Sequence, residues 1–364
     1  MPLFCIVFAI ASLGILTSTL PFVPAAHGMV RAFDFPRFQI LAVALLVLII
    51  SVILLPWPEF WPIAGMLGAA CLIQIAYVAR FTPIWRRAVP TFSGEPDDAS
   101  RVRLLVSNVK QSNRDYSKLS ALVEKLDPDI AVFMETNQDW IDALSSVVSH
   151  YPNRMECPLD NSYGMLMVSR FPLSDSRVRF LLNKEVPSFD TMATAANGMR
   201  FRIVALHPEP PIPTRDTIGR DSEILFVAKL VRHDTFPVIV TGDLNDVAWS
   251  STTRRFLRIS RLLDPREGRG PYNTFDARFF FLRWPLDHIF HSSHFQVSAM
   301  KRQAFVGSDH FPMFYDLILA NAGAENEISE PATPADLEEA RELIAIEKKR
   351  DRRPPGTDWE DGST

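Results

Sequence analysis

Polar side chains able to bind a metal ion or transfer a proton stand at the ends of six short apolar segments. Four of these segments, such as IAVFM at 130–134, have the length and composition of a buried β-strand, and the other two, 284–286 and 307–308, lead directly into polar residues. A charge at such a position is costly unless it is paired or holds a metal. Because strand ends meet at one edge of an α/β sheet, we expect these side chains to form one site. They are Asn108, Glu135, His207, Asp243 with Asn245, Asp287, and Asp309 with His310.

The donor atoms of this set indicate a hard cation. Oxygen ligands without thiolates favour Mg²⁺ or Mn²⁺. The chain has no HExxH motif, CxxC pair, GxSxG elbow or P-loop, which disfavours zinc, serine-nucleophile and ATPase chemistry. Each position taken alone has a structural alternative. These are a turn residue at Asn108, a helix-cap partner at Glu135, a strand-to-helix turn at Asp243 and Asn245, and a local hydrogen-bonded pair at Asp309 and His310.

Seven segments resemble, in the same order, the endonuclease/exonuclease/phosphatase family, which includes DNase I-like nucleases, inositol polyphosphate phosphatases and sphingomyelinases. The resemblance covers about residues 101–319. The HPEPP variant and the apolar leader are similar to a membrane-bound bacterial subgroup with VanJ-type glycopeptide-resistance proteins. The segments are LLVSNVK (104–110), PDIAVFMET (128–136), YGMLMVSRFPL (163–173), VALHPEPP (204–211), VIVTGDLND (238–246), PLDHIF (285–290) and GSDHFP (307–312).

The resemblance implies a DNase I-like four-layer α/β sandwich, in which two packed sheets are flanked by helices. It implies that Glu135 is the main metal ligand, helped by Asp309 and, through water, by Asn108. Asp243 would orient or deprotonate the attacking water, and Asn245 would hold a phosphate oxygen.

The resemblance also gives roles to the histidines. His310, oriented by Asp287, would stabilise the transition state or act as acid/base. His207 would donate to another phosphate oxygen, and its alternative is a structural hydrogen bond. The physics fits, because a histidine beside a carboxylate stays cationic near neutral pH and phosphoryl transfer needs positive charge at the equatorial oxygens.

The elements that position these residues alternate between strands and helices, which predicts an α/β catalytic domain over residues 101–320. A C-terminal region, 321–364, follows: Thr333 and Pro334 begin a predicted helix, and the chain after Pro354-Pro355 is expected to be disordered. The predicted strands are 102–107, 129–134, 164–169, 200–206, 237–241, 287–291, 295–300 and 313–319, and the predicted helices are 117–126, 138–148 and 219–231.

Residues 1–87 read as a membrane region. Apolar runs at about 3–23, 38–55 and 60–79 are each long enough for a transmembrane helix. Residues 88–100 are rich in Pro, Gly, Ser and Asp and read as a linker. We therefore expect a multi-pass protein of a bacterial inner membrane, with the lipid bilayer as its partner and no obligate protein partner.

The side of the membrane stays open. Basic residues lie before the second run and after the third, whereas the short loop 56–59 has none, so the positive-inside rule places the catalytic domain in the cytoplasm. The resemblance to resistance proteins that act on cell-wall precursors suggests the periplasmic or extracellular face instead.

Three functions are compatible with the sequence. The first is a metal-dependent phosphoesterase acting on phosphate or pyrophosphate esters, with lipid-linked esters among its candidate substrates. For such a substrate we expect the aromatic segment 274–284 (FFFL at 279–282) to insert into the bilayer surface. The alternative for that segment is a buried strand and its approach. The second function is a membrane-tethered nuclease, which the net charge of −4 disfavours unless Arg254, Arg255, Arg258 and Arg261 form a basic groove. The third is a non-catalytic membrane scaffold.

Overall fold

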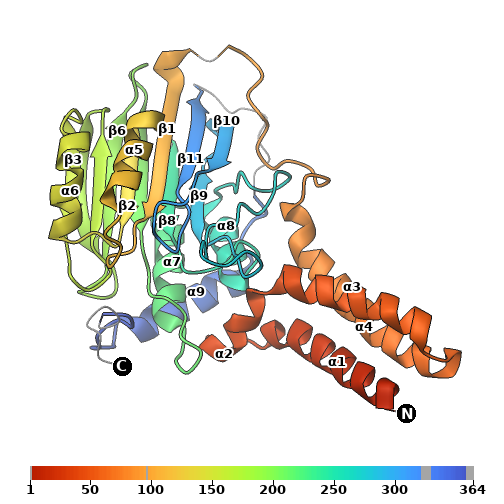
Figure 1. Cartoon of the computed structure of the whole chain (residues 1–364). Coiled ribbons are helices and arrows are strands. Elements are labelled where there is room, and N and C mark those ends of the chain that lie inside the picture. Colours follow the sequence, from red (N-terminus) through yellow and green to blue (C-terminus); the bar gives the residue numbers. More distant parts are fainter. Residues whose placement is uncertain (1, 96, 321–328, 358–364) are drawn as a thin grey trace.

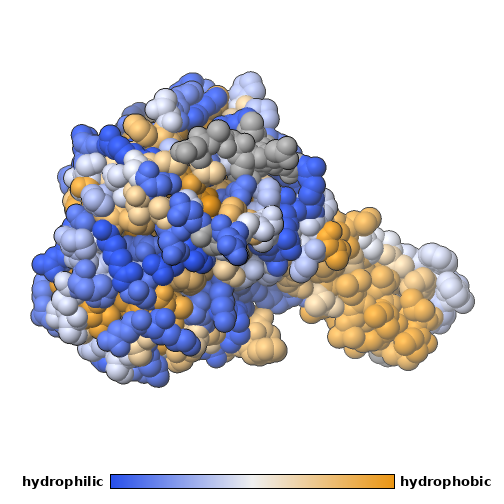
Figure 2. Space-filling model, turned by 90° about the horizontal axis from the view of Figure 1, so that it is seen from above, coloured by the Kyte–Doolittle hydropathy of each residue, from blue (hydrophilic) through white to orange (hydrophobic). Residues whose placement is uncertain are grey.

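Three long apolar helices open the chain in the computed structural model, which describes residues 2–95, 97–320 and 329–357. They are α1 (Pro2–Thr19), α3 (Arg37–Leu54) and α4 (Trp57–Val78). Each is long and apolar enough to cross a membrane, with mean hydropathies of 2.3, 2.6 and 1.8. They project together from the α/β part, and their surface is almost wholly apolar (Figures 1 and 2). This confirms the prediction of three N-terminal helices that are long and apolar enough to cross a membrane.

Eleven strands within the described ranges form two sheets, with the orders β10-β11-β1-β2-β4-β3 and β5-β6-β7-β8-β9. Their bounds are β1 (Arg101–Asn108), β2 (Ile130–Met134), β3 (Asn153–Cys157), β4 (Met165–Ser169), β5 (Leu173–Phe180), β6 (Pro187–Thr194), β7 (Arg200–Leu206), β8 (Val238–Asp243), β9 (Asp287–His291), β10 (Phe295–Arg302) and β11 (Met313–Leu319). The helices that accompany them are α2 (Gly28–Arg31), α5 (Tyr116–Leu126), α6 (Gln138–Val148), α7 (Ile218–Val231), α8 (Ser251–Ser260) and α9 (Pro334–Glu347).

The two sheets pack face to face, and the alternation along each strand explains why. On β1, Leu104 and Val106 point into the core between the sheets, whereas Leu105 points outward beneath α5 and α6. On β8, Ile239 joins the same core, while Val240 faces α7, α8 and α9. Each sheet therefore has an apolar face toward the other sheet and another toward helices. The result is the predicted four-layer α/β sandwich.

Five elements were not predicted from the sequence. Strand β5 is largely exposed at a sheet edge, so it lacks the apolar pattern of a buried strand. Strands β3 and β6 and helices α2 and α8 were also missed. Helix α8 begins at Ser250, whose hydroxyl accepts a hydrogen bond from the Thr253 backbone N–H at 2.9 Å.

The linker and tail expectations need correction where the structure describes them. Val89 is fully buried in the core between the sheets, and Phe92 donates its N–H to the Val297 carbonyl, so the start of 88–100 is packed rather than free. In the tail, Pro354, Pro355 and Gly356 are buried, because the preceding arginines anchor the segment. Residues 321–328 and 358–364 lie outside the described residues.

The membrane helices are docked tightly on the α/β part. A Cβ on Gly28 would lie 1.9 Å from the Ile212 carbonyl oxygen, so only glycine permits this approach. The indole N–H of Trp249 donates to the Asp34 carbonyl at 2.6 Å, and its ring packs on Phe38 of α3. The start of α3 thus packs on the surface of the α/β part.

Candidate active site

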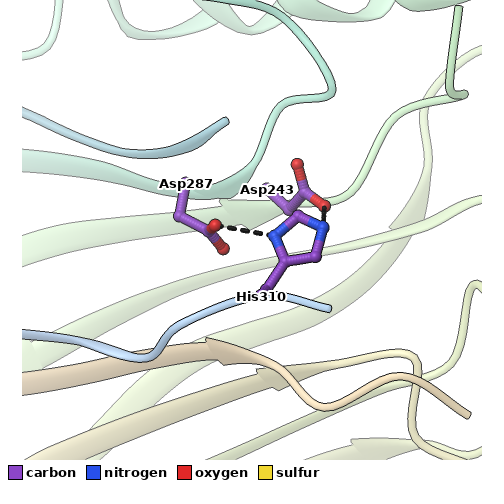
Figure 3. A group of neighbouring side chains, drawn as sticks. All are labelled: Asp243, Asp287 and His310. Carbon is purple, nitrogen blue, oxygen red and sulfur yellow. Dashed lines mark hydrogen bonds and ion pairs between the residues drawn. The ribbon is translucent and has the colours of Figure 1, made fainter. Parts of the chain in front are cut away.

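The predicted residues converge where the edges of the two sheets meet. Asn108 ends β1 and Glu135 follows β2, and these parallel strands are paired in register there. Asp243 on β8 lies directly opposite Asp287 on β9. The Asn108 side-chain amide joins the two sheets, since it donates to Glu135 Oε1 at 2.7 Å and to Asp243 Oδ2 at 3.0 Å. His310 lies between the two aspartates (Figure 3).

The backbone at this edge is held in unusual conformations. Glu135, Asn245 and Lys110 have φ angles of 61°, 52° and 58°, in the left-handed region that side chains other than glycine rarely adopt. Gly242, with φ 139°, lets β8 approach β7, because a Cβ there would lie 1.9 Å from the Leu206 carbonyl oxygen. Such strain persists only where the surroundings impose it, and it concentrates at functional sites.

His310 forms a buried ion-paired system with two aspartates. Its Nδ1 lies 2.8 Å from Asp287 Oδ2 and its Nε2 lies 3.4 Å from Asp243 Oδ2 (Figure 3). Burial alone would lower the pKa of His310, but the charges of Asp243 and Asp287 outweigh it and raise that pKa to about 10. The imidazole is therefore a cation at neutral pH.

These three residues offer ligand-type atoms within 4.8 Å of one another. Each ring nitrogen of His310 already faces a carboxylate oxygen, so the trio is better described as a charge-paired histidine than as a metal-ligand set. Burial raises the pKa of Asp243 to about 6, and the His310 charge opposes that rise. Asp243 can therefore accept a proton near neutral pH.

The oxygen-rich group beside this trio suits a divalent cation. Glu135 is half-buried and receives hydrogen bonds only from neutral donors among the described residues, the Asn108 amide and the Gln111 N–H. Burial, reinforced by the charge of Asp309, raises the pKa of Glu135 to about 7. A divalent ion would supply the missing positive charge, and Mg²⁺ prefers this kind of donor. The set Glu135, Asp309 and Asn108 therefore fits the metal that the sequence predicts.

His207 and Asn245 border the same pocket. His207 Nε2 lies 3.8 Å from Asp243 Oδ2, and burial, with the charge of His310, lowers the pKa of His207 to about 3, so its ring is neutral. Its Nδ1 is buried and has no hydrogen-bond partner in the described part of the chain. Asn245 donates its N–H to Asp243 Oδ1 at 2.9 Å and its side-chain amide to the Pro208 carbonyl.

The pocket has a volume of about 440 Å³ and a mixed lining. The acids and imidazoles of the site form part of it. Apolar side chains also line it and include Phe35, from the segment between α1 and α3, whose ring packs edge-on against Trp284 at 5.7 Å. Pro210, Pro211 and Leu286 are further apolar lining residues. A ligand in the pocket would thus meet both charged and apolar side chains.

Several residues of the pocket were not predicted. Lys110 Nζ pairs with Asp309 Oδ2 at 2.9 Å, and Arg278 lies 3.8 Å from the same oxygen. Pro355 and Gly356, from the far end of the chain, line the pocket beside His207, and the Pro355 carbonyl accepts a hydrogen bond from the Tyr163 hydroxyl. Only Lys110 had a sequence signal, as a cation two residues after Asn108.

The four arginines expected of a nuclease groove lie elsewhere. None of them lines this pocket. Arg255 and Arg258 pair with Asp336 at the start of α9, and Arg261 ends α8. His288, by contrast, is buried behind the site, with its ring nitrogens on Arg266 and on the Asp246 carbonyl.

Residues 105–310, more than half of the chain, match the Endonuclease/Exonuclease/phosphatase family. No curated protein matches the chain. TDP2 from D. rerio complexed with single-strand DNA product is similar in structure, with a TM-score of 0.51 and 16% identity over 60% of this chain and 99% of that chain. A humanized D. rerio TDP2 gives a TM-score of 0.50 and 16% identity over the same shares.

A mannosyl-6-phosphatase from Bacteroides thetaiotaomicron is also similar, with a TM-score of 0.46 and 19% identity over 60% of this chain and 100% of that chain. At these identities the likeness is one of fold.

Proposed function

The chain belongs to the endonuclease/exonuclease/phosphatase family, and from this premise we propose that it is a membrane-anchored, divalent-metal-dependent phosphoesterase acting on lipid-linked phosphate or pyrophosphate esters. The observation that carries the proposal is the mixed lining of the pocket. The lining combines residues suited to phosphoryl transfer with apolar side chains, among them Phe35, two residues before α3 begins at Arg37. A lipid-linked phosphate likewise combines a charged headgroup with an apolar chain.

The tip of the 274–284 segment supports the same substrate class. Phe279, Phe280 and Phe281 are 48%, 85% and 69% exposed, so this is not the buried strand of the alternative interpretation. The Phe281 carbonyl accepts a hydrogen bond from the Gln39 amide at 2.9 Å, which ties the tip to the start of α3. Exposed aromatic residues beside a membrane helix favour insertion at the bilayer surface.

In the proposed reaction Asp243 takes a proton from the attacking water. Its carboxylate is oriented by the Asn245 N–H and the Asn108 amide. The cationic His310, held by Asp287, stabilises negative charge that develops on the phosphoryl oxygens. Neutral His207 offers a further hydrogen bond. A divalent ion held by Glu135 and Asp309, with Asn108 acting through water, would neutralise charge on the phosphate.

The test is Mg²⁺-dependent phosphate release from a polyprenyl diphosphate by the detergent-purified full chain, with Asp243→Asn as the inactive control. We expect release that vanishes in the variant and that EDTA abolishes. A second variant, Phe280→Ser with Phe281→Ser, should lower turnover of the lipid substrate in vesicles but leave hydrolysis of a water-soluble aryl phosphate unchanged.

Two results would overturn the proposal. Aryl phosphate turnover without any lipid turnover would keep the phosphoesterase and remove the lipid substrate. Plasmid nicking by the wild type but not by Asp243→Asn, with no phosphate release from either small substrate, would favour the nuclease instead. Protease accessibility of the C-terminal tail in sealed vesicles would fix the side of the membrane on which the catalytic domain lies.

A further inference from the structure

A second cavity lies where α4 leaves the membrane region, and it shares no lining residue with the candidate active site. Its volume is about 420 Å³. Its wall comes from the last turns of α4, from α8 and from the segment after α4. We propose that this cavity binds the headgroup of an anionic phospholipid, with Arg254 as the main phosphate ligand and Arg80 beside it. The cavity is neither part of the reaction nor required by the proposed function.

The position of the cavity along α4 supports a lipid ligand. The apolar stretch that can cross a membrane ends at Phe81, so Tyr77 and Arg80 occupy its last turn. Arg80 is the first charged residue after Glu59. Just beyond it, Ile84 and Trp85 are 93% and 45% exposed, as expected of side chains at a membrane–water interface. The cavity therefore opens at the level of the lipid phosphates.

Among the cationic residues that line the cavity, Arg254 has no acidic partner in the described part of the chain. Arg80 has Glu330 at 3.7 Å, an exposed pair worth little, and Arg258 is engaged by Asp336. The exposed Arg254 has no ion pair to any described residue; its guanidinium lies 4.9 Å above the ring of Tyr77. A guanidinium fixed on an aromatic face keeps its N–H donors available for a phosphate.

The acids of the cavity do not cancel this charge. Asp264 is engaged by Arg266 at 2.6 Å. Glu267 lies half-buried in the cavity wall, and that burial raises the pKa of its carboxyl to about 7. The aromatic side chains of Tyr77 and Trp85 are also part of the lining. Cationic donors beside aromatic rings suit the phosphate and glycerol of a phospholipid, and guanidinium groups near a bilayer favour anionic lipids.

The experiment uses the full chain in detergent and measures lipid binding by native mass spectrometry. Phosphatidylglycerol, phosphatidylcholine and glycerol phosphate are titrated separately. We expect wild type to bind phosphatidylglycerol better than phosphatidylcholine, and Arg254→Gln to bind it about fivefold more weakly. The matched control is Arg177→Gln on the exposed strand β5, which should bind as wild type does.

Asp243→Asn should also bind phosphatidylglycerol as wild type does, because Asp243 belongs to the other pocket. Equal affinity of wild type and Arg254→Gln would overturn the proposal, as would equal affinity for the two phospholipids. Tight binding of glycerol phosphate at the same residues would show a soluble phosphate site in place of a lipid site. Should Arg254→Gln melt lower than wild type, Arg254→Lys and Trp85→Ala take its place, both expected to weaken the same binding.

Discussion

Replacing Asp287 with asparagine is expected to give catalysis a new pH dependence. Asp287 Oδ2 lies 2.8 Å from His310 Nδ1, and both groups are buried. At an effective dielectric constant of about 20, two unit charges roughly 4 Å apart interact by about 4 kcal/mol, which is about three pKa units. The wild-type pKa of His310 is raised to about 10, so the variant's imidazole should titrate near 7, by that roughly three-unit fall.

The sign of the effect follows from the charged form. A raised histidine pKa keeps the cation present below that pKa, and the cation is lost as the pH rises through it. Deprotonation of His310 should therefore cause no decrease in wild-type kcat/KM between pH 6 and about 9. In Asp287→Asn, by contrast, activity should fall progressively above about pH 7. The assay is the pH profile of aryl phosphate hydrolysis at saturating Mg²⁺. A profile parallel to that of wild type, lowered by one constant factor, would refute the electrostatic role of Asp287.

Three further outcomes are expected. Glu135→Gln should raise the Mg²⁺ concentration needed for half-maximal activity by more than about 100-fold, because about 100-fold is the upper range for residues that only support a metal ligand. An unchanged Mg²⁺ concentration for half-maximal activity would show that Glu135 is not a metal ligand. Burial raises the pKa of Glu223 from 4.5 to about 8, so the folded state keeps a proton that the unfolded chain releases, and stability falls as the pH rises across that window. As the pH rises from 4.5 to 7, wild type should therefore lose about 3 kcal/mol of stability relative to Glu223→Gln, which would be seen as a growing difference in Tm between the two proteins. A difference in Tm that stays constant with pH would contradict this. Arg352→Ala, which removes the 2.9 Å ion pair to Glu209, should make the chain after Arg352 more accessible to a broad-specificity protease such as proteinase K and raise KM, while Arg341→Ala, at an exposed position on α9, should do neither.

The convergence of the site could be predicted because it depends on strand ends. Asp243 ends β8 and Asp287 begins β9, so the antiparallel pairing of these strands sets the two residues opposite each other, and the apolar residues of each strand mark it in the sequence. The same logic placed Asn108 beside Glu135. Local composition was enough here, because the period of a strand fixes which side chains reach the edge.

The remaining features depend on contacts that local patterns do not encode. Phe35 reaches the pocket from the membrane region and Pro355 from the opposite end of the chain. The proline-rich composition of the tail indicates disorder. Arg352 nevertheless pairs with Glu209 and Glu347, and these ion pairs hold the segment that contains Pro355 in place. Strand β5 escaped prediction because its exposed residues carry no apolar period.

In the proposed membrane-anchored enzyme, the contacts of Phe35, Gly28 and Trp249 between the N-terminal helices and the α/β part would fix the height of the pocket above the bilayer. A catalytic domain on a long flexible linker would move through a volume of solvent, whereas this one would move only parallel to the membrane plane. For the proposed lipid substrate, the encounter is then a two-dimensional collision. Its rate follows the mole fraction of substrate among the lipids, so diluting the vesicles in buffer should leave turnover unchanged, and diluting the substrate with inert lipid should slow it.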